Sequence, residues 1–208
     1  MKLYYFNSYG RAEVIRLLLD YAKAEYEDIR YTKEEWAEVK NDSEKFRYGQ
    51  VPVLEKDGKF YCQTIAILRF LGREYGYYPT DPELVYQHEK VMDICTDFLI
   101  PLIKVFFMES PEEKQKAFGE LIATHFPKFF GYFEDHLKEN SSKDYMIGDS
   151  ITVVDFAILN LIYENAYNEK TKDFVMPVLE NYPTLKAYLE TRIEAQKEYF
   201  DSRPKCDH

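Results

Sequence analysis

The chain has 208 residues, of which 46% are hydrophobic and 17% aromatic, and this composition suits one or two folded domains with a substantial core. Its formal net charge of −10 argues against a nucleic acid or an anionic membrane as partner, although a small local basic pocket remains compatible with it. No apolar run approaches the roughly 18 residues of a membrane helix, and the apolar stretch after Met1 is too short for a signal sequence. We therefore expect a soluble protein.

The cysteines and histidines indicate a reducing compartment and no zinc site. Cys62, Cys95 and Cys206 are odd in number and far apart in the sequence, which predicts free thiols and a cytoplasmic location. The chain has no Cys-x-x-Cys motif, and its four histidines show no His-x-x-x-His spacing. We therefore expect no bound metal.

The N-terminal part of the chain begins with a strand–helix–strand pattern. Lys2–Phe6 predicts a buried strand, apolar residues at helical spacing follow, and Tyr26–Tyr31 predicts a second strand. A unit this short predicts a parallel, right-handed crossover. Thr32 is expected to cap a short helix over Lys33–Lys40.

A hairpin and a further helix complete this part. The Asp57-Gly58 pair predicts a tight turn between strands Val53–Lys56 and Lys59–Cys62, and Thr64–Tyr75 has a helical pattern. The whole order predicts a four-stranded mixed sheet with helices packed on it, which is a thioredoxin-like α/β domain.

The composition changes after Tyr75, where turn-forming residues without periodicity predict a linker. We expect a first domain over residues 1–76, a linker over 77–82 and an all-helical domain over 83–208. Long helices are expected from Glu83 and from Pro111, the second of them interrupted at Pro127, and a further helix is expected from Pro183.

A helix start is marked clearly near residue 152. Thr152 suits the N-cap, Asp155 suits the third helical position, and Ile151 and Phe156 suit a hydrophobic staple. This motif predicts a role in folding rather than in catalysis.

Several short motifs are spread along the whole chain, namely Tyr5-Phe6-Asn7 with Gly10-Arg11-Ala12-Glu13, Trp36 with Lys40, Gly49-Gln50-Val51-Pro52, Gln63-Thr64-Ile65-Ala66, Ile147-Gly148-Asp149-Ser150-Ile151-Thr152 with Asp155-Phe156, and Arg203-Pro204. In their residues and their order they resemble the motifs of sigma-class glutathione transferases, among them the haematopoietic prostaglandin D synthases. The resemblance implies a cytoplasmic, homodimeric enzyme that conjugates glutathione, its co-substrate, to small hydrophobic electrophiles.

Such an enzyme must stabilise a thiolate, because a free cysteine thiol has a pKa of ~8.5. Four hydroxyl groups near the end of the first strand could do so, namely those of Tyr4, Tyr5, Ser8 and Tyr9. The residue pattern alone does not choose among them. The resemblance selects Tyr5 as the hydrogen-bond donor, with Ser8 as the alternative, and it places Arg11 in the same site, where a packing role is equally open.

The resemblance also implies where the tripeptide binds. Its γ-glutamyl carboxylate is expected at the start of the third helix, beside Gln63 and Thr64. Its cysteinyl main chain is expected to pair with Val51, in the manner of an added strand, with Gln50 nearby. We expect the bond before Pro52 to be cis and Gln63 to hold a strained backbone conformation.

Trp36 and Lys40 are implied as the anchors of the glycine carboxylate of glutathione. They are spaced i,i+4 and so share one helical face. The alternative is a tryptophan packed under a solvated lysine side chain, and the residues alone favour that alternative.

The acceptor pocket is expected among Tyr9, Arg11, Lys104, Phe107 and Tyr199, whose aromatic members equally suit an ordinary core. Tyr9 stands where the related prostaglandin D synthases have a basic residue, and Lys104 where they have an aromatic one. These differences favour general glutathione transfer, with glutathione-dependent prostaglandin-H2 D-isomerisation as the alternative.

Asp93 and Asp97 are also spaced i,i+4, which suits a solvated acidic face. The resemblance implies instead that Asp97 crosses the interface of a homodimer and pairs with the γ-glutamyl ammonium group in the partner's site. Thr96 replaces a carboxylate that helps to hold a divalent ion in related synthases, so no metal is expected.

Two non-transferase functions are compatible with the same scaffold. One is a non-catalytic binding or crystallin-like structural protein, which the intact Tyr5 and the absence of an evident insertion disfavour. The other is a dithiol oxidoreductase, which is disfavoured because no cysteine lies at the end of the first strand.

Overall fold

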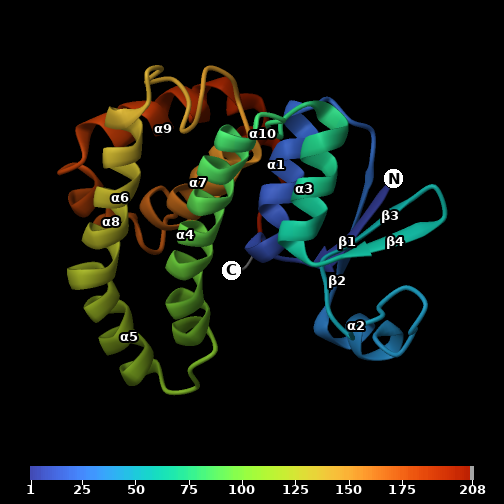
Figure 1. Ribbon diagram of the computed structural model, residues 1–208. Helices are drawn as coiled ribbons and strands as arrows, with labels where there is room; N and C mark the ends of the chain where they lie inside the picture. The colour runs from blue at the N-terminus through green and yellow to red at the C-terminus, as the bar shows by residue number, and fades with distance from the viewer. Residues whose placement is uncertain (207–208) are drawn as a thin grey trace. The chain divides into compact units, whose positions relative to one another are not determined.

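The computed structural model describes residues 1–206, so positions 207 and 208 of the expected helical domain lie outside the described residues. The chain forms two compact units (Figure 1). One contains Met1–Tyr78 together with the segment that begins at Gln196, and the other contains Pro79–Ala195. The segment from Gln196 thus packs with the first unit, although it follows the helical unit in sequence. The domain limits expected above remain a prediction.

The first unit contains a four-stranded mixed sheet, which confirms the predicted α/β fold. Its strands are β1 (Lys2–Phe6), β2 (Glu27–Tyr31), β3 (Val53–Lys56) and β4 (Lys59–Cys62), in the spatial order β2-β1-β3-β4. β1 runs parallel to β2 and antiparallel to β3, and β4 runs antiparallel to β3. The connection from β1 to β2 contains α1 (Glu13–Tyr21), and the predicted Asp57-Gly58 turn joins β3 to β4.

Successive side chains of β1 point to opposite faces of the sheet, so the core of this unit has a part on each face. On one face, α1 and α3 (Thr64–Tyr75) lie side by side (Figure 1). Leu3 and Leu54, which pair in register, are fully buried. On the other face, Tyr4 packs with Phe46 and with residues near α2 (Lys33–Val39). Tyr5, the residue after Tyr4, therefore belongs to a different layer from its neighbour.

Residues Pro79–Ala195 form helices and contain no strand, which confirms the predicted helical region. The helices are α4 (Pro82–Phe106), α5 (Pro111–Glu120), α6 (Phe126–Glu139), α7 (Val153–Ala166), α8 (Lys172–Leu179) and α9 (Pro183–Ala195). Phe98 of α4 is fully buried against aromatic rings of α6, including Phe126 at 5.2 Å between centroids. The sequence patterns did not predict α8, nor α10 (Lys197–Ser202) in the first unit.

The expected interruption at Pro127 is a π-helical turn rather than a break. The turn η2 (Leu121–His125) joins α5 to α6, and the Phe126 N–H donates to the Leu121 carbonyl. Proline has no N–H for an i→i−4 bond, and the wider turn accommodates this loss without ending the helical path.

The helix start at residue 152 has the predicted N-cap and third-position residues. Thr152 is the N-cap of α7, and the buried Asp155 carboxylate accepts the Thr152 N–H at 2.7 Å. It also accepts the Met146 N–H at 2.9 Å and the Tyr188 hydroxyl at 2.6 Å. One carboxylate therefore joins a loop, the start of α7 and α9.

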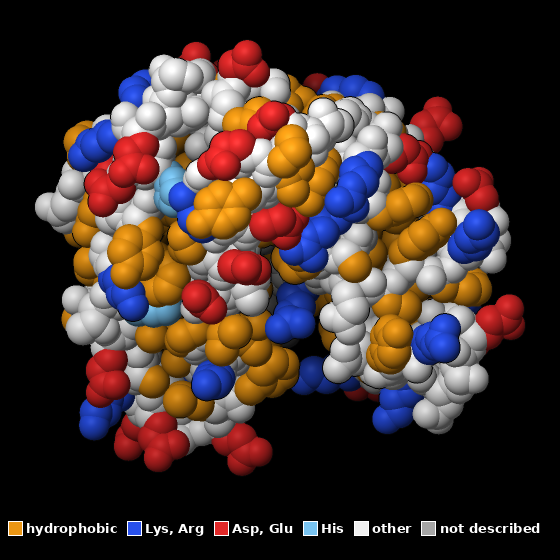
Figure 2. Space-filling view, in the orientation of Figure 1, with side chains coloured by type: hydrophobic (Ala, Val, Ile, Leu, Met, Phe, Trp, Pro, Cys, Tyr) orange, Lys and Arg blue, Asp and Glu red, His pale blue; other side chains and the backbone are white. Residues whose placement is uncertain are grey.

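The surface mixes charge types. On the face shown in Figure 2, acidic and basic side chains are interspersed with hydrophobic ones. Across residues 1–206, no helix combines the length and the apolar character required to cross a membrane.

Candidate active site

Tyr5 lies at the end of β1 and is 7% exposed. Its hydroxyl oxygen accepts the Arg11 backbone N–H at 3.0 Å. Burial raises the pKa of Tyr5 above its usual value, although this hydrogen bond and the charges of Arg11 and Arg16 act in the opposite direction. The group is therefore a neutral phenol near pH 7, and its proton remains available to a further acceptor.

Glycine at position 10 makes this arrangement sterically possible. Gly10 begins the short turn η1 (Gly10–Ala12) with a positive φ of +43°. A Cβ atom at this position would lie 2.6 Å from the Tyr5 hydroxyl oxygen. The sequence motif contained Gly10, but nothing in the sequence alone explained the glycine.

The other candidate hydroxyls have different surroundings. Tyr4 faces the opposite side of the sheet, and its hydroxyl donates to the Glu55 carboxylate. The Tyr9 ring lies under the Arg203 guanidinium, with 3.8 Å between the guanidinium carbon and the ring centroid. Ser8 is partly exposed in the loop between Tyr5 and Arg11. Ser8 therefore remains the alternative donor.

The start of α3 has the backbone geometry that we expected. Gln63 precedes the helix with φ 72° and ψ 115°, a strained conformation for a residue with a side chain. The Val51–Pro52 peptide bond is cis, as predicted. The Thr64 hydroxyl oxygen is buried and has no hydrogen-bond partner among the described residues. A buried, unpaired hydroxyl at a helix N-terminus suits an anionic ligand.

Val51 precedes the cis peptide bond and has main-chain groups that its own unit does not use. No hydrogen bond within residues 1–206 uses its N–H or its carbonyl oxygen. Its side chain packs into the cluster around Tyr4 and Val53, which holds the segment in place, and the neighbouring Gln50 is exposed. These features suit pairing with an extended peptide.

Trp36 and Lys40 lie on one side of α2, as their spacing predicts. The half-buried Trp36 ring packs against Phe46 at 4.9 Å and Phe6 at 5.7 Å between centroids, so the packing alternative describes its ring correctly. Its indole N–H and the exposed Lys40 ammonium have no hydrogen-bond or ion-pair partner in the part of the chain that the structure describes. A packing role for the ring and a binding role for the N–H are therefore compatible.

The predicted acceptor residues belong to both units and are described within each. In the first unit, the Arg11 side chain is exposed, and the Tyr199 hydroxyl donates to the Glu13 carboxylate at 2.8 Å. In the second unit, Lys104 is exposed near the end of α4 and Phe107 is 75% exposed. The Tyr199 hydroxyl is thus engaged within its own unit.

Asp93 and Asp97 are both exposed on α4, together with Thr96. This exposed stripe lies apart from the buried residues Met92, Cys95 and Phe98 of the same helix. Within residues 1–206, no cluster of three or more His, Cys, Asp or Glu side chains is arranged to hold a metal ion.

Two charged residues lie on the buried side of α1. The sequence motifs contained Glu13 without assigning it a role, and they did not contain Arg16. Glu13 and Arg16 are 0% and 1% exposed, and they form an ion pair at 3.0 Å. The Arg16 guanidinium carbon lies 5.8 Å from the centroid of the Tyr5 ring. Their i,i+3 spacing among the apolar residues of α1 was the available signal.

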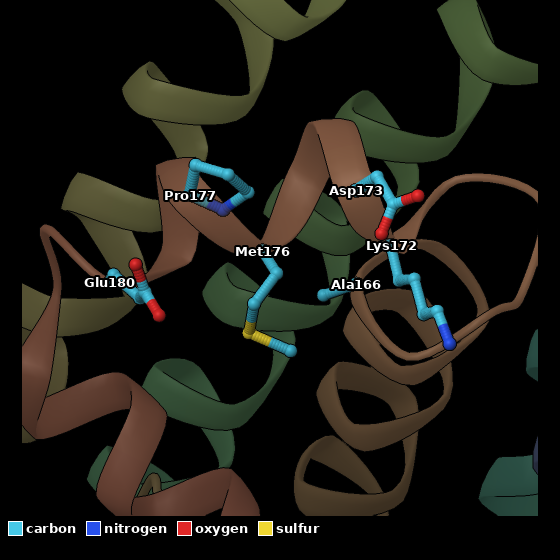
Figure 3. A pocket seen from close by; sticks show the side chains of 6 residues that line it. All are labelled: Ala166, Lys172, Asp173, Met176, Pro177 and Glu180. Carbon is cyan, nitrogen blue, oxygen red and sulfur yellow. The ribbon is translucent and has the colours of Figure 1, made fainter.

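The second unit contains a separate pocket of about 340 Å³ (Figure 3). Its lining residues are Ala166, Lys172, Asp173, Met176, Pro177 and Glu180. Lys172 pairs with Glu169 at 2.8 Å. None of these residues belongs to the predicted site, and the pocket has no thiol or hydroxyl group in its lining.

Comparison with known proteins accounts for both units. A family model described as glutathione S-transferase, N-terminal domain matches residues 1–73, and one described as glutathione S-transferase, C-terminal domain matches residues 96–203. The chain is 31% identical to glutathione S-transferase A4 of Mus musculus over 193 residues, or 92% of this chain and 82% of that protein.

Two further similarities extend this result. The chain is 30% identical to hematopoietic prostaglandin D synthase of Gallus gallus over 194 residues, or 93% of this chain and 90% of that protein. The solved structure of monomeric Na-GST-3, a glutathione S-transferase from the hookworm Necator americanus, matches with a TM-score of 0.86 at 31% identity, covering 100% of this chain and 98% of that one. The chain therefore belongs to the glutathione S-transferase family, and it is a transferase enzyme that uses glutathione as co-substrate.

Proposed function

We propose that this enzyme conjugates glutathione to small hydrophobic electrophiles, and that the Tyr5 hydroxyl stabilises the glutathione thiolate. The observation that carries the proposal is the 3.0 Å hydrogen bond from the Arg11 N–H to the Tyr5 oxygen. Because the oxygen accepts this bond, its own proton is directed elsewhere. The raised pKa of Tyr5 keeps that proton in place near neutral pH.

The required stabilisation is within reach of one hydroxyl. Lowering a thiol pKa by about two units from ~8.5 requires roughly 2.7 kcal/mol. A hydrogen bond to a charged group contributes about 1.5–3 kcal/mol. The thiol proton leaves to solvent, the sulfur forms a bond to the electrophilic carbon, and the leaving group departs with its electron pair. Tyr5 keeps its proton throughout.

The tripeptide is anchored at both ends in this proposal. Thr64, Gln63 and the N-terminus of α3 bind the γ-glutamyl carboxylate, which gives the unpaired Thr64 hydroxyl a partner. The unused main-chain groups of Val51 pair with the cysteinyl residue. The Trp36 indole N–H and the Lys40 ammonium bind the glycine carboxylate.

The proposal places the enzyme in the sigma class, in the cytoplasm, as a homodimer. The supporting features are the sigma-like motifs, the free thiols and the exposed Asp97 on α4. Asp97 pairs with the γ-glutamyl ammonium of glutathione bound to the partner. Asp97→Asn is expected to weaken glutathione binding, and Asp93→Asn is the matched control. A monomer that turns over at the full rate contradicts this arrangement.

A second candidate reaction is glutathione-dependent prostaglandin-H2 D-isomerisation. The supporting observation is the 30% identity to a hematopoietic prostaglandin D synthase over most of both chains. The residues at positions 9 and 104 favour conjugation. The related prostaglandin D synthases have a basic residue where this chain has Tyr9, and an aromatic residue where it has Lys104.

The test combines retention on immobilised glutathione with a chromogenic aryl-halide conjugation assay. Retention with turnover is expected. Retention without turnover contradicts the proposed reaction, and the same protein is then assayed for conversion of prostaglandin H2. Failure to bind immobilised or free glutathione contradicts the proposed site as a whole.

A further inference from the structure

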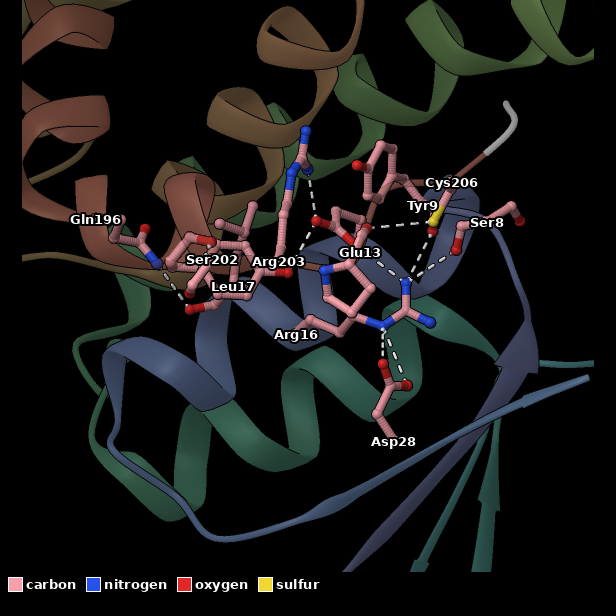
Figure 4. Close-up of polar contacts among 12 residues, drawn as sticks. Ser8, Tyr9, Glu13, Arg16, Leu17, Asp28, Gln196, Ser202, Arg203 and Cys206 are labelled. Carbon is pink, nitrogen blue, oxygen red and sulfur yellow. Dashed lines mark hydrogen bonds and ion pairs between the residues drawn. The ribbon is translucent and has the colours of Figure 1, made fainter.

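The segment after α9 returns to α1 within the first unit (Figure 4). Gln196 is 5% exposed, and its side-chain amide donates to the Leu17 carbonyl at 3.0 Å. Tyr199 of α10 and Arg203, which follows α10, both reach Glu13 at the start of α1. The segment therefore makes specific polar contacts near the loop that follows Tyr5.

Glu13 is the centre of these contacts. One carboxylate oxygen accepts the Tyr199 hydroxyl at 2.8 Å and an Arg203 N–H at 2.6 Å. The other oxygen pairs with Arg16 at 3.0 Å. Because Glu13 is fully buried, these partners supply the hydrogen bonds that its two carboxylate oxygens need.

Arg203 joins the loop that follows Tyr5 to the start of α1. Its guanidinium pairs with Glu13 and also lies over the Tyr9 ring, 3.8 Å from the centroid. An arginine suits both contacts, since its planar group stacks on an aromatic face while it donates to a carboxylate. Tyr9 and Glu13 flank Arg11, whose N–H binds the Tyr5 hydroxyl.

Arg16 holds the same loop from a different side. Its Nη1 donates to the Ser8 carbonyl at 3.0 Å, and its Nε donates to Asp28 of β2 at 3.1 Å. The loop between Tyr5 and Arg11 is thus fixed by two guanidinium groups, which meet at Glu13.

We propose that Arg203 is a positioning residue for glutathione transfer. It holds the Tyr9 ring and the Glu13 carboxylate so that the Arg11 N–H stays on the Tyr5 hydroxyl. The inference rests on the proposed function, because it acts through the thiolate-stabilising role of Tyr5. It adds a requirement for a residue that follows the last helix and touches neither the thiolate nor Tyr5 itself.

The test is an ultraviolet titration of bound glutathione thiolate in the full-length enzyme, with steady-state kinetics. Arg203→Met is expected to raise the apparent pKa of the bound thiol by about 0.5–1 unit. It is expected to lower kcat roughly fivefold to fiftyfold, since small misplacements of reacting groups are costly. The KM for glutathione should change less than kcat.

Two companion variants make the result specific. Arg203→Lys keeps the charge beside Glu13 but loses the planar stacking on Tyr9, so its thiol pKa should lie between those of the wild type and Arg203→Met. Lys205→Met removes an exposed charge from the same segment and should match the wild type. Should Arg203→Met fail to fold, as judged by circular dichroism, Arg203→Lys decides the question.

The outcomes separate this inference from the proposed function. If the wild type forms the thiolate, and both Arg203 variants have the same bound-thiol pKa and the same turnover as the wild type, only the role of Arg203 is contradicted. Glutathione that binds to the wild type without forming a thiolate contradicts the role of Tyr5, and the role of Arg203 with it. A raised pKa in folded Arg203 variants, with Lys205→Met unchanged, supports the inference.

Discussion

A Cβ atom added to Gly10 would lie 2.6 Å from the hydroxyl oxygen of Tyr5. Atoms at that distance overlap, so the tyrosine ring or the loop would have to move. The same loop supplies the Arg11 N–H to this hydroxyl at 3.0 Å. The position of the proposed catalytic group therefore depends on the absence of a side chain five residues later.

Gly10→Ala is expected to lower transfer activity roughly tenfold to a hundredfold, because it displaces the Tyr5 hydroxyl. Gly58→Ala is the control variant. Gly58 also has a positive φ, of +72°, but a Cβ atom there would meet nothing within 4 Å, so this variant has backbone strain without the steric overlap. Kinetic assays of both variants, with thermal unfolding, separate the two effects. Equal activities of the two variants would contradict the steric account.

Thr64→Val is expected to separate binding from stability. The Thr64 hydroxyl is buried without a partner among the described residues, so its loss should leave the melting temperature unchanged or slightly raised. Loss of a hydrogen bond to a carboxylate should weaken glutathione binding about tenfold to a hundredfold. Calorimetric titration with glutathione measures this effect, and unchanged affinity would remove Thr64 from the site.

Trp36 is the only tryptophan in the chain, which makes its fluorescence a direct report on the proposed glycine-carboxylate site. Glutathione is expected to change this emission. Lys40→Met should weaken the response about twofold to fivefold, and the difference should shrink at high salt, because the pair is solvent-exposed. A response that is independent of Lys40 would assign the carboxylate to other residues.

Asp155→Ala is expected to lower the unfolding free energy by about 3–5 kcal/mol, because it leaves several buried donors unpaired. Those donors include the Met146 N–H and the Tyr188 hydroxyl. Asp149→Ala, at an exposed position of the preceding loop, serves as the control. Denaturant unfolding of both variants gives the comparison, and equal stabilities would show that the network contributes little.

The sequence predicted most of the α/β unit because its signals are local. The Asp57-Gly58 turn and the alternation in β1 each specify one element, and the observed hairpin has the predicted limits. The Thr152 start of α7 is a further local signal. In contrast, α8 and α10 are short, and the sequence patterns did not indicate them.

The sequence motifs name the members of the proposed site but not the residues that support them. Motifs named Tyr5, Thr64 and Trp36, whereas the contacts of Arg203 join residues that are 190 positions apart in the chain. No periodicity or spacing rule reports a contact of that length. The reason for Gly10 was hidden in the same way, because it depends on the distance to the Tyr5 oxygen rather than on the local turn.

The role of Tyr5 is tested most directly by titrating the thiolate absorbance of glutathione bound to the wild type and to Tyr5→Phe. The wild-type pKa is expected to lie about two units below ~8.5. Removing the hydroxyl should raise it by about 1–2 units, so that conjugation at pH 7 falls while activity at higher pH recovers. Because the pKa of Tyr5 itself is raised, the titrating group in this range is the thiol rather than the phenol. An unchanged apparent pKa in Tyr5→Phe, with glutathione still bound, would contradict the account and direct attention to Ser8.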